Sequence, residues 1–210
     1  MAARFFVNGT VNTLWSNTAN WSTTSGGATG STVPGTSDVV TLDENSPNCN
    51  IDFNTGGAVR TCSSFTVTSG YVNTLTFDNS LVVAAGVTLG TNMQPILGNG
   101  TFRMGVNQSI TSNGIAIPNL AINTNCVITF NDPCVIKNVL YIAISNTTVG
   151  LNGSPISIYG GFILWPGAIA NVQSTVTGST VINLMNYNGR PSILGTVNNT
   201  INITSPTRGY

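Results

Sequence analysis

The chain has 210 residues, of which only six are Lys or Arg and six are Asp or Glu, with no histidine. A formal net charge of zero excludes a basic face for nucleic acid, and the absence of histidine excludes Ser-His-Asp and Cys-His catalysis and His-ligated metal sites. Solubility instead depends on neutral polar groups, because the sequence contains 28 Asn, 30 Thr, 19 Ser and 23 Gly. The 41% hydrophobic share is enough to build a core, so a disordered chain is not expected.

The first 45 residues contain two of the three tryptophans, Trp15 and Trp21, and a tract rich in Gly, Ser and Thr over residues 22–36. They end at a predicted strand over residues 38–43. We interpret residues 1–45 as an N-terminal β cap with Trp15, Asn20 and Trp21 as its structural residues, because the open end of a stacked sheet needs covering. The start of the chain lacks an apolar run of secretory length, so no export signal is expected.

From residue 46 onward, short segments alternate apolar or aromatic residues with small polar ones, and turn residues separate them. This pattern predicts strands at 64–68, 74–77, 83–89, 101–104, 126–130, 156–158 and 201–203, and almost no helix. Residues 75–83 align without gaps with residues 128–136 and 149–157. Such a period of about 20 to 28 residues favours a β-solenoid.

The predicted fold is therefore all-β, a right-handed parallel β-helix of about seven coils over residues 46–210 behind the N-terminal cap. A β-sandwich is the alternative, because one sequence does not fix strand pairing. Coils stacked at about 4.8 Å place equivalent side chains above one another, where Asn can hydrogen-bond along the stack and charges would repel. Asn also tolerates the left-handed backbone of tight corners.

The four cysteines, Cys49, Cys62, Cys126 and Cys134, contain no C-x-x-C pair, which argues against a zinc site. The alternating apolar residues that follow Cys126 and Cys134 indicate buried free thiols. A Cys49–Cys62 bridge stays open. No catalytic, metal or cofactor-binding residue is predicted, and no membrane insertion. Of the six acids only Asp78 and Asp132 fall on predicted coils, at corners where Asp makes local turn hydrogen bonds. They are too far apart for a glycosidase pair.

Aromatic residues in the last third of the chain are the candidates for surface contacts. Tyr159, Trp165 and Tyr187 are interpreted as glycan or subunit contacts, or as residues that pack in the core. A thin solenoid buries little apolar surface, so association of several copies is expected.

The opening run of residues 4–9, followed by Trp15, Asn20-Trp21-Ser22, Gly26-Gly27, Pro34 and residues 38–43, resembles the tryptophan-rich start of β-solenoid proteins from bacteriophage tail spikes and fibres and from bacterial surface adhesins. Residues 109–123 are similar to a coil of the same proteins.

The resemblance implies a non-enzymatic virion structural protein made in the host cytoplasm: a short trimeric tail spike or fibre that binds other virion proteins and contacts a host cell-surface glycan. A capsid decoration protein, a bacterial adhesin fragment and a polysaccharide depolymerase are the alternatives.

Overall fold

The computed structural model describes residues 1–8, 12–53, 59–142, 148–164, 169–173, 182–184, 192–193, 196–198 and 201–203. Within these residues the chain forms β-strands and a single 3-10 turn, η1 (Thr18–Asn20). It divides into two compact units, Met1–Arg103 and Met104–Tyr210. This division, after Arg103, differs from the boundary predicted after residue 45. The N-terminal cap and the number of coils stay predictions.

Unit 1 contains a parallel ladder that begins before residue 45 and continues beyond it. The ladder joins β1 (Ala3–Phe6), β3 (Val39–Leu42), β5 (Arg60–Val67) and β7 (Leu81–Thr88) in that order. A second parallel sheet joins β4 (Cys49–Ile51), β6 (Leu75–Phe77) and β8 (Leu97–Gly98). Strand β2 (Trp21–Ser22) pairs antiparallel with β1, and β9 (Thr101–Met104) contains the unit boundary.

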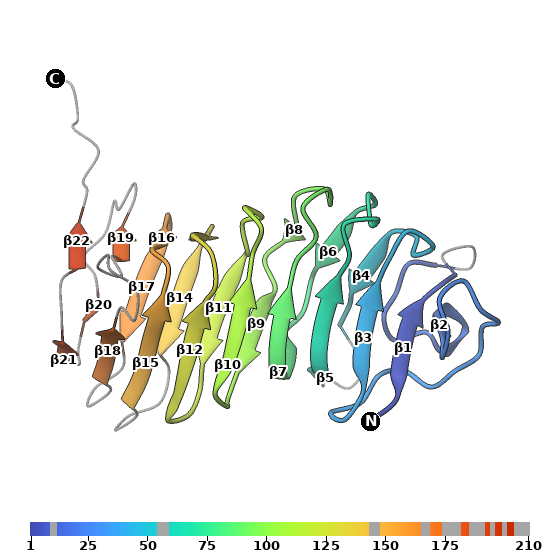
Figure 1. The fold of residues 1–210 in the computed structure, drawn as a ribbon, viewed down its shortest axis with the longest axis horizontal. Helices are drawn as coiled ribbons and strands as arrows, with labels where there is room; N and C mark the ends of the chain where they lie inside the picture. Colours follow the sequence, from blue (N-terminus) through green and yellow to red (C-terminus); the bar gives the residue numbers. More distant parts are fainter. Residues whose placement is uncertain are drawn as a thin grey trace, which may run out of the picture. The chain divides into compact units, whose positions relative to one another are not determined.

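Unit 2 is built from three parallel ladders (Figure 1). The first contains β10 (Gln108–Thr111), β12 (Cys126–Phe130), β15 (Thr148–Gly153), β18 (Ile169–Gln173) and β21 (Thr196–Asn198). The second contains β11 (Asn119–Ile122), β14 (Val139–Ile142), β17 (Gly161–Leu164) and β20 (Ser192–Ile193). The third contains β13 (Cys134–Ile136), β16 (Ile156–Ile158), β19 (Ile182–Leu184) and β22 (Ile201–Ile203).

The ladders confirm a parallel β-solenoid and not a sandwich. Paired residues such as Gln108 and Ile128, or Ile156 and Ile182, lie 20 and 26 positions apart, within the predicted period. The strands of one coil come from successive ladders, so each turn of the chain rests on the previous turn.

The predicted gapless alignment of repeats is wrong. It superimposes residues 75–77 on 128–130, but β6 belongs to the sheet β4-β6-β8 while β12 pairs with β10 and β15. It also sets Ile128 against Val149, whereas Ile128 pairs with Leu151. The reason is that all the strands of a coil share one pattern of apolar, small and apolar residues, so the pattern does not identify the face of the coil.

Alternation of buried and outward side chains holds within the strands. In β12, Cys126, Ile128 and Phe130 are buried, while Val127 is exposed and Thr129 is half-buried. The pairing of β5 with β7 contains one register shift, between Cys62 and Ser64. Successive side chains in a strand point to opposite sides, so the apolar set fills the interior of the coil.

Asparagine side chains connect neighbouring coils, as predicted, but their partners differ from a simple Asn ladder. The Asn73 amide donates to the Ser46 carbonyl (2.8 Å), and the Asn119 side-chain oxygen accepts from the Val139 amide (3.1 Å). Asn113 is the one non-glycine residue with positive φ in the described chain. The abundance of Asn in this protein therefore reflects bonding between coils more than left-handed corners.

Candidate functional site

Tyr159 lies at the corner that follows β16 and is 41% exposed. Its backbone amide donates to the Ile136 carbonyl of the neighbouring coil (3.0 Å), which fixes the position of its backbone. The other two predicted aromatic contacts, Trp165 and Tyr187, lie outside the described residues. Tyr159 is therefore the aromatic candidate whose surroundings can be described.

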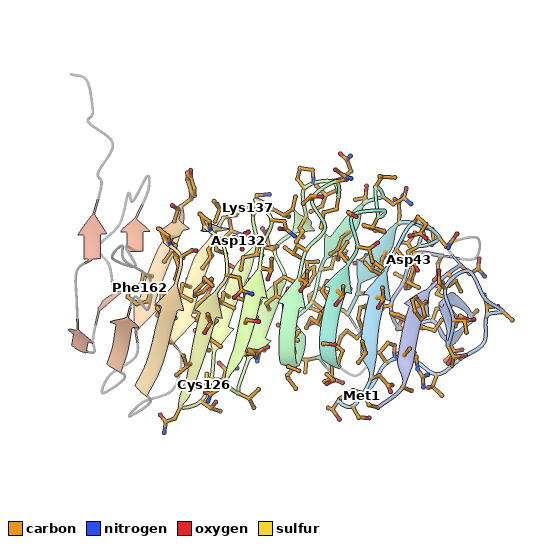
Figure 2. All side chains as sticks on the ribbon, in the orientation of Figure 1. Met1, Asp43, Cys126, Asp132, Lys137 and Phe162 are labelled. Atoms are coloured by element: carbon orange, nitrogen blue, oxygen red, sulfur yellow. The ribbon has the colours of Figure 1, made fainter. Side chains whose placement is uncertain are left out.

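Lys137 occupies the corner one coil away from Tyr159. The last register pair of β13 and β16 joins Ile136 to Ile158, so Lys137 and Tyr159 take the next equivalent positions. Neighbouring strands in a sheet are about 4.8 Å apart, which brings the two side chains within reach of one small ligand. Figure 2 shows Lys137 at the outer edge of its coil.

The backbone of this corner is tightly constrained. Gly161 donates to the Asn138 carbonyl (2.7 Å), and a Cβ at Gly160 would lie 2.1 Å from the same oxygen. A side chain at position 160 would therefore force the two coils apart. Glycine here allows the close approach that places Tyr159 beside Lys137.

An open cleft of about 380 Å³ is lined by Val135, Lys137, Asn138 and Tyr159. The cleft brings together an aromatic ring, an ammonium group, an amide and a small apolar side chain. Sequence reasoning identified Tyr159 but missed the other three residues. The one signal in the sequence concerns Lys137, which is the single lysine of the chain. Only the register shows that its position neighbours that of Tyr159.

The coil acids Asp78 and Asp132 are bonded to the neighbouring coil. The two carboxylate oxygens of Asp132 accept from the Ser112 amide (2.7 Å) and the Ser112 hydroxyl (2.9 Å). Asp78 accepts from the Asn50 amide (2.9 Å). The prediction that these carboxylates bond within their own turns is wrong about the donors. Each donor comes from the adjacent coil, because stacking brings Asn50 to Asp78 and Ser112 to Asp132.

The three predicted cap residues are interior residues of unit 1. Trp15, Asn20 and Trp21 are fully buried, and the two indole rings meet edge to face with centroids 4.7 Å apart. The Trp21 Nε1 donates to the Trp15 carbonyl (2.7 Å), and the Asn20 amide donates to the Leu14 carbonyl (2.9 Å). The first bond connects β2 to the segment before it, and the second lies within that segment. The three residues therefore contribute to packing within the unit.

All four cysteines are free and buried, and the bridge left open between Cys49 and Cys62 is not formed. Burial raises the pKa of the Cys62 and Cys134 thiols to about 12 and also raises the pKa values of Cys49 and Cys126. The reactive form of cysteine is the thiolate. At neutral pH these thiols are therefore protonated side chains of the core.

No group of three or more Cys, Asp or Glu residues that could hold a metal ion occurs in the described part of the chain. Among the same residues, no helix is long and apolar enough to cross a bilayer.

Comparison with known proteins does not place the chain in a family. No family model matches it, and no curated protein or solved structure matches it either. A functional assignment therefore has to start from the fold and from the cleft beside Tyr159.

Proposed function

We propose that this chain is a non-enzymatic structural protein of a bacteriophage virion, a short trimeric tail spike or fibre that attaches to the particle and contacts a glycan of the host surface. The observation that carries the proposal is the open cleft at Tyr159 on the outside of a stack of neutral coils. Aromatic faces are suitable surfaces for the apolar faces of sugar rings, and a stacked solenoid is a suitable support for them.

The scaffold supports a projecting role because neighbouring coils are joined by more than their ladders. Side chains bridge one coil to the next in both units, from Asn73 to Ser46 in unit 1 and from Ser112 to Asp132 in unit 2. These connections between coils are hydrogen bonds, and no disulfide takes part in them. Such a stack suits a protein that has to keep its shape outside a cell.

The non-enzymatic part of the proposal rests on how the coil acids are used. Asp132 accepts two hydrogen bonds from Ser112, and Asp78 accepts one from Asn50. A glycosidase needs two carboxylates facing one sugar linkage across about 5 to 10 Å. Carboxylates that already bridge two coils are better explained as structural groups.

Two measurements on the purified protein test the proposal. Light scattering after gel filtration is expected to give three times the 21.8 kDa chain mass, and a monomer would overturn the trimeric spike. Incubation with capsular and lipopolysaccharide glycans is expected to show binding without new reducing ends. Release of reducing ends would overturn the non-enzymatic assignment and favour a depolymerase.

Antibody labelling in the electron microscope tests the location. We expect label on the tails of virus particles from the source of the sequence. Label over the capsid would favour a decoration protein, and label on the cell surface without particles would favour an adhesin. Either result would overturn the tail assignment.

A further inference from the structure

The cleft beside Tyr159 also contains a positively charged side chain, Lys137. In the described residues of that unit, Lys137 and Asp132 are the only charged side chains. Both oxygens of Asp132 are engaged by Ser112, at the opposite end of β13 from Lys137. Among the described residues that line the cleft, Lys137 is the charged one.

We propose that the cleft selects sugars that carry a carboxylate, with the pyranose face on Tyr159 and the carboxylate at Lys137. This inference rests on the proposed glycan binding and specifies the substrate class of that site. It requires only the charge of Lys137, which an ammonium group keeps while it makes other contacts.

The spacing of the two residues fits one sugar unit. Lys137 and Tyr159 occupy equivalent corner positions on successive coils, about 4.8 Å apart along the stack. A carboxylate attached to a pyranose ring lies at the ring edge, so a ring on Tyr159 can direct this group toward the neighbouring coil. Val135 and Asn138 add an apolar side chain and an amide to the lining of the cleft.

The surroundings strengthen the preference for an anion over a neutral sugar. The described residues that line the cleft are one cation, one amide, one aromatic and one apolar side chain, with no acid among them. A hydrogen bond between an ammonium group and a carboxylate is shorter and stronger than one between neutral groups. A neutral sugar would make the ring contact with Tyr159 but would lack this bond.

The test compares ligand pairs that differ in charge. Trigalacturonate is measured against its methyl ester, and 3′-sialyllactose against lactose, by calorimetry with the full chain. We expect at least one acid to bind about tenfold more tightly than its neutral counterpart, as one charge-assisted bond would provide. The difference should shrink as salt rises from low to high concentration, because screening weakens exposed charge pairs. The two pairs distinguish uronic from sialic acids.

Variants separate this inference from the proposed function. Lys137→Gln should remove the preference for the acid and leave binding of the neutral ligand, while Lys137→Arg should retain the preference. Tyr159→Ala should weaken binding of both ligands, and Thr129→Ala, on an outward position of β12, should change neither. Circular dichroism of each variant checks that it is folded.

The outcomes have distinct meanings. Equal binding of acid and ester, with loss of both in Tyr159→Ala, would overturn the acid preference and leave glycan binding in place. Absence of binding to every ligand, including the host polysaccharides used above, would overturn glycan binding at this cleft. Binding that survives Tyr159→Ala unchanged would place the glycan site elsewhere and also overturn the inference.

Discussion

The two units are built from the same kind of stacked coil, but their interiors differ. In unit 1 a chain of ring contacts runs from Trp21 through Trp15, Phe65 and Phe102 to Phe77, with centroid separations from 4.5 to 6.2 Å. In the described part of unit 2, aliphatic residues stack on their equivalents in the next coil, as Leu120 does on Leu140 and Ile136 on Ile158.

The two interiors differ because the interior segment of unit 1 that contains Trp15 and Trp21 does not repeat, whereas the coils of unit 2 do. The segment of Trp15 and Trp21 does not repeat from coil to coil, so it has no equivalent residue on which to stack. Large rings fill such an irregular space, and their polar atoms can bond to the backbone. A regular coil can use Ile or Leu again at each level, because the residue below has the same shape.

The largest difference between the units is expected at the buried ion pair of unit 1. The Arg60 guanidinium donates to the Asp52 carboxylate (3.0 Å), and both side chains are less than a tenth exposed. Arg60→Met leaves the carboxylate buried without its cation, so we expect a loss of about 3 to 5 kcal/mol in the free energy of unfolding. Urea denaturation followed by circular dichroism measures it.

Two controls accompany this prediction. Lys137→Met, at an exposed position of unit 2, should change the free energy of unfolding by less than about 0.5 kcal/mol. The double variant Asp52→Leu with Arg60→Met should recover much of the loss, because no buried charge remains. If the double variant is as unstable as Arg60→Met, the unpaired charge is not the cause.

A smaller difference is expected from the ring contacts. Phe65 and Phe130 are both buried on strands, but Phe65 contacts the rings of Trp15 and Phe102. Substitution by Leu nearly conserves volume, so Phe130→Leu should cost about 1 kcal/mol. Phe65→Leu should cost about 1 to 3 kcal/mol more, because two aromatic contacts are lost.

Thermal and urea unfolding of these two variants, measured side by side, test this difference. Equal losses would show that the aromatic contacts of unit 1 add nothing beyond the apolar area that they bury. The contrast between the interiors would then be one of shape alone.

The sequence predicted the strands better than it predicted their neighbours. Residues 126–130 and 156–158 are strands with the predicted bounds, because alternation of period two is visible along the chain. Lys137 and Tyr159 come to equivalent positions only because Ile136 of one coil pairs with Ile158 of the next. That register is set by coil lengths that vary, so a pattern along the chain does not contain it.

The same limit explains the acids. Asp132 reads as a turn residue in the sequence, since Pro133 follows it, and the corner position was predicted correctly. Its partner, Ser112, lies 20 residues earlier and comes close only through stacking. Local chemistry was therefore predictable from the chain, whereas chemistry between coils was not.

The smallest expected effect concerns what the two units share, the asparagine bonds between coils. Asn73→Ala in unit 1 removes the donor to the Ser46 carbonyl, and Asn119→Ala in unit 2 removes the acceptor for the Val139 amide. Each should cost about 1 kcal/mol, the net value of one such bond. Asn123→Ala is the matched control, because the Asn123 side chain makes no hydrogen bond to the described residues.

Similar losses for the first two variants in urea unfolding would mean that asparagine bonds between coils stabilise both units, although the interiors of the units differ. A loss confined to Asn73→Ala would mean instead that unit 2 is held by its ladders alone, and that its asparagines serve solubility and not stacking.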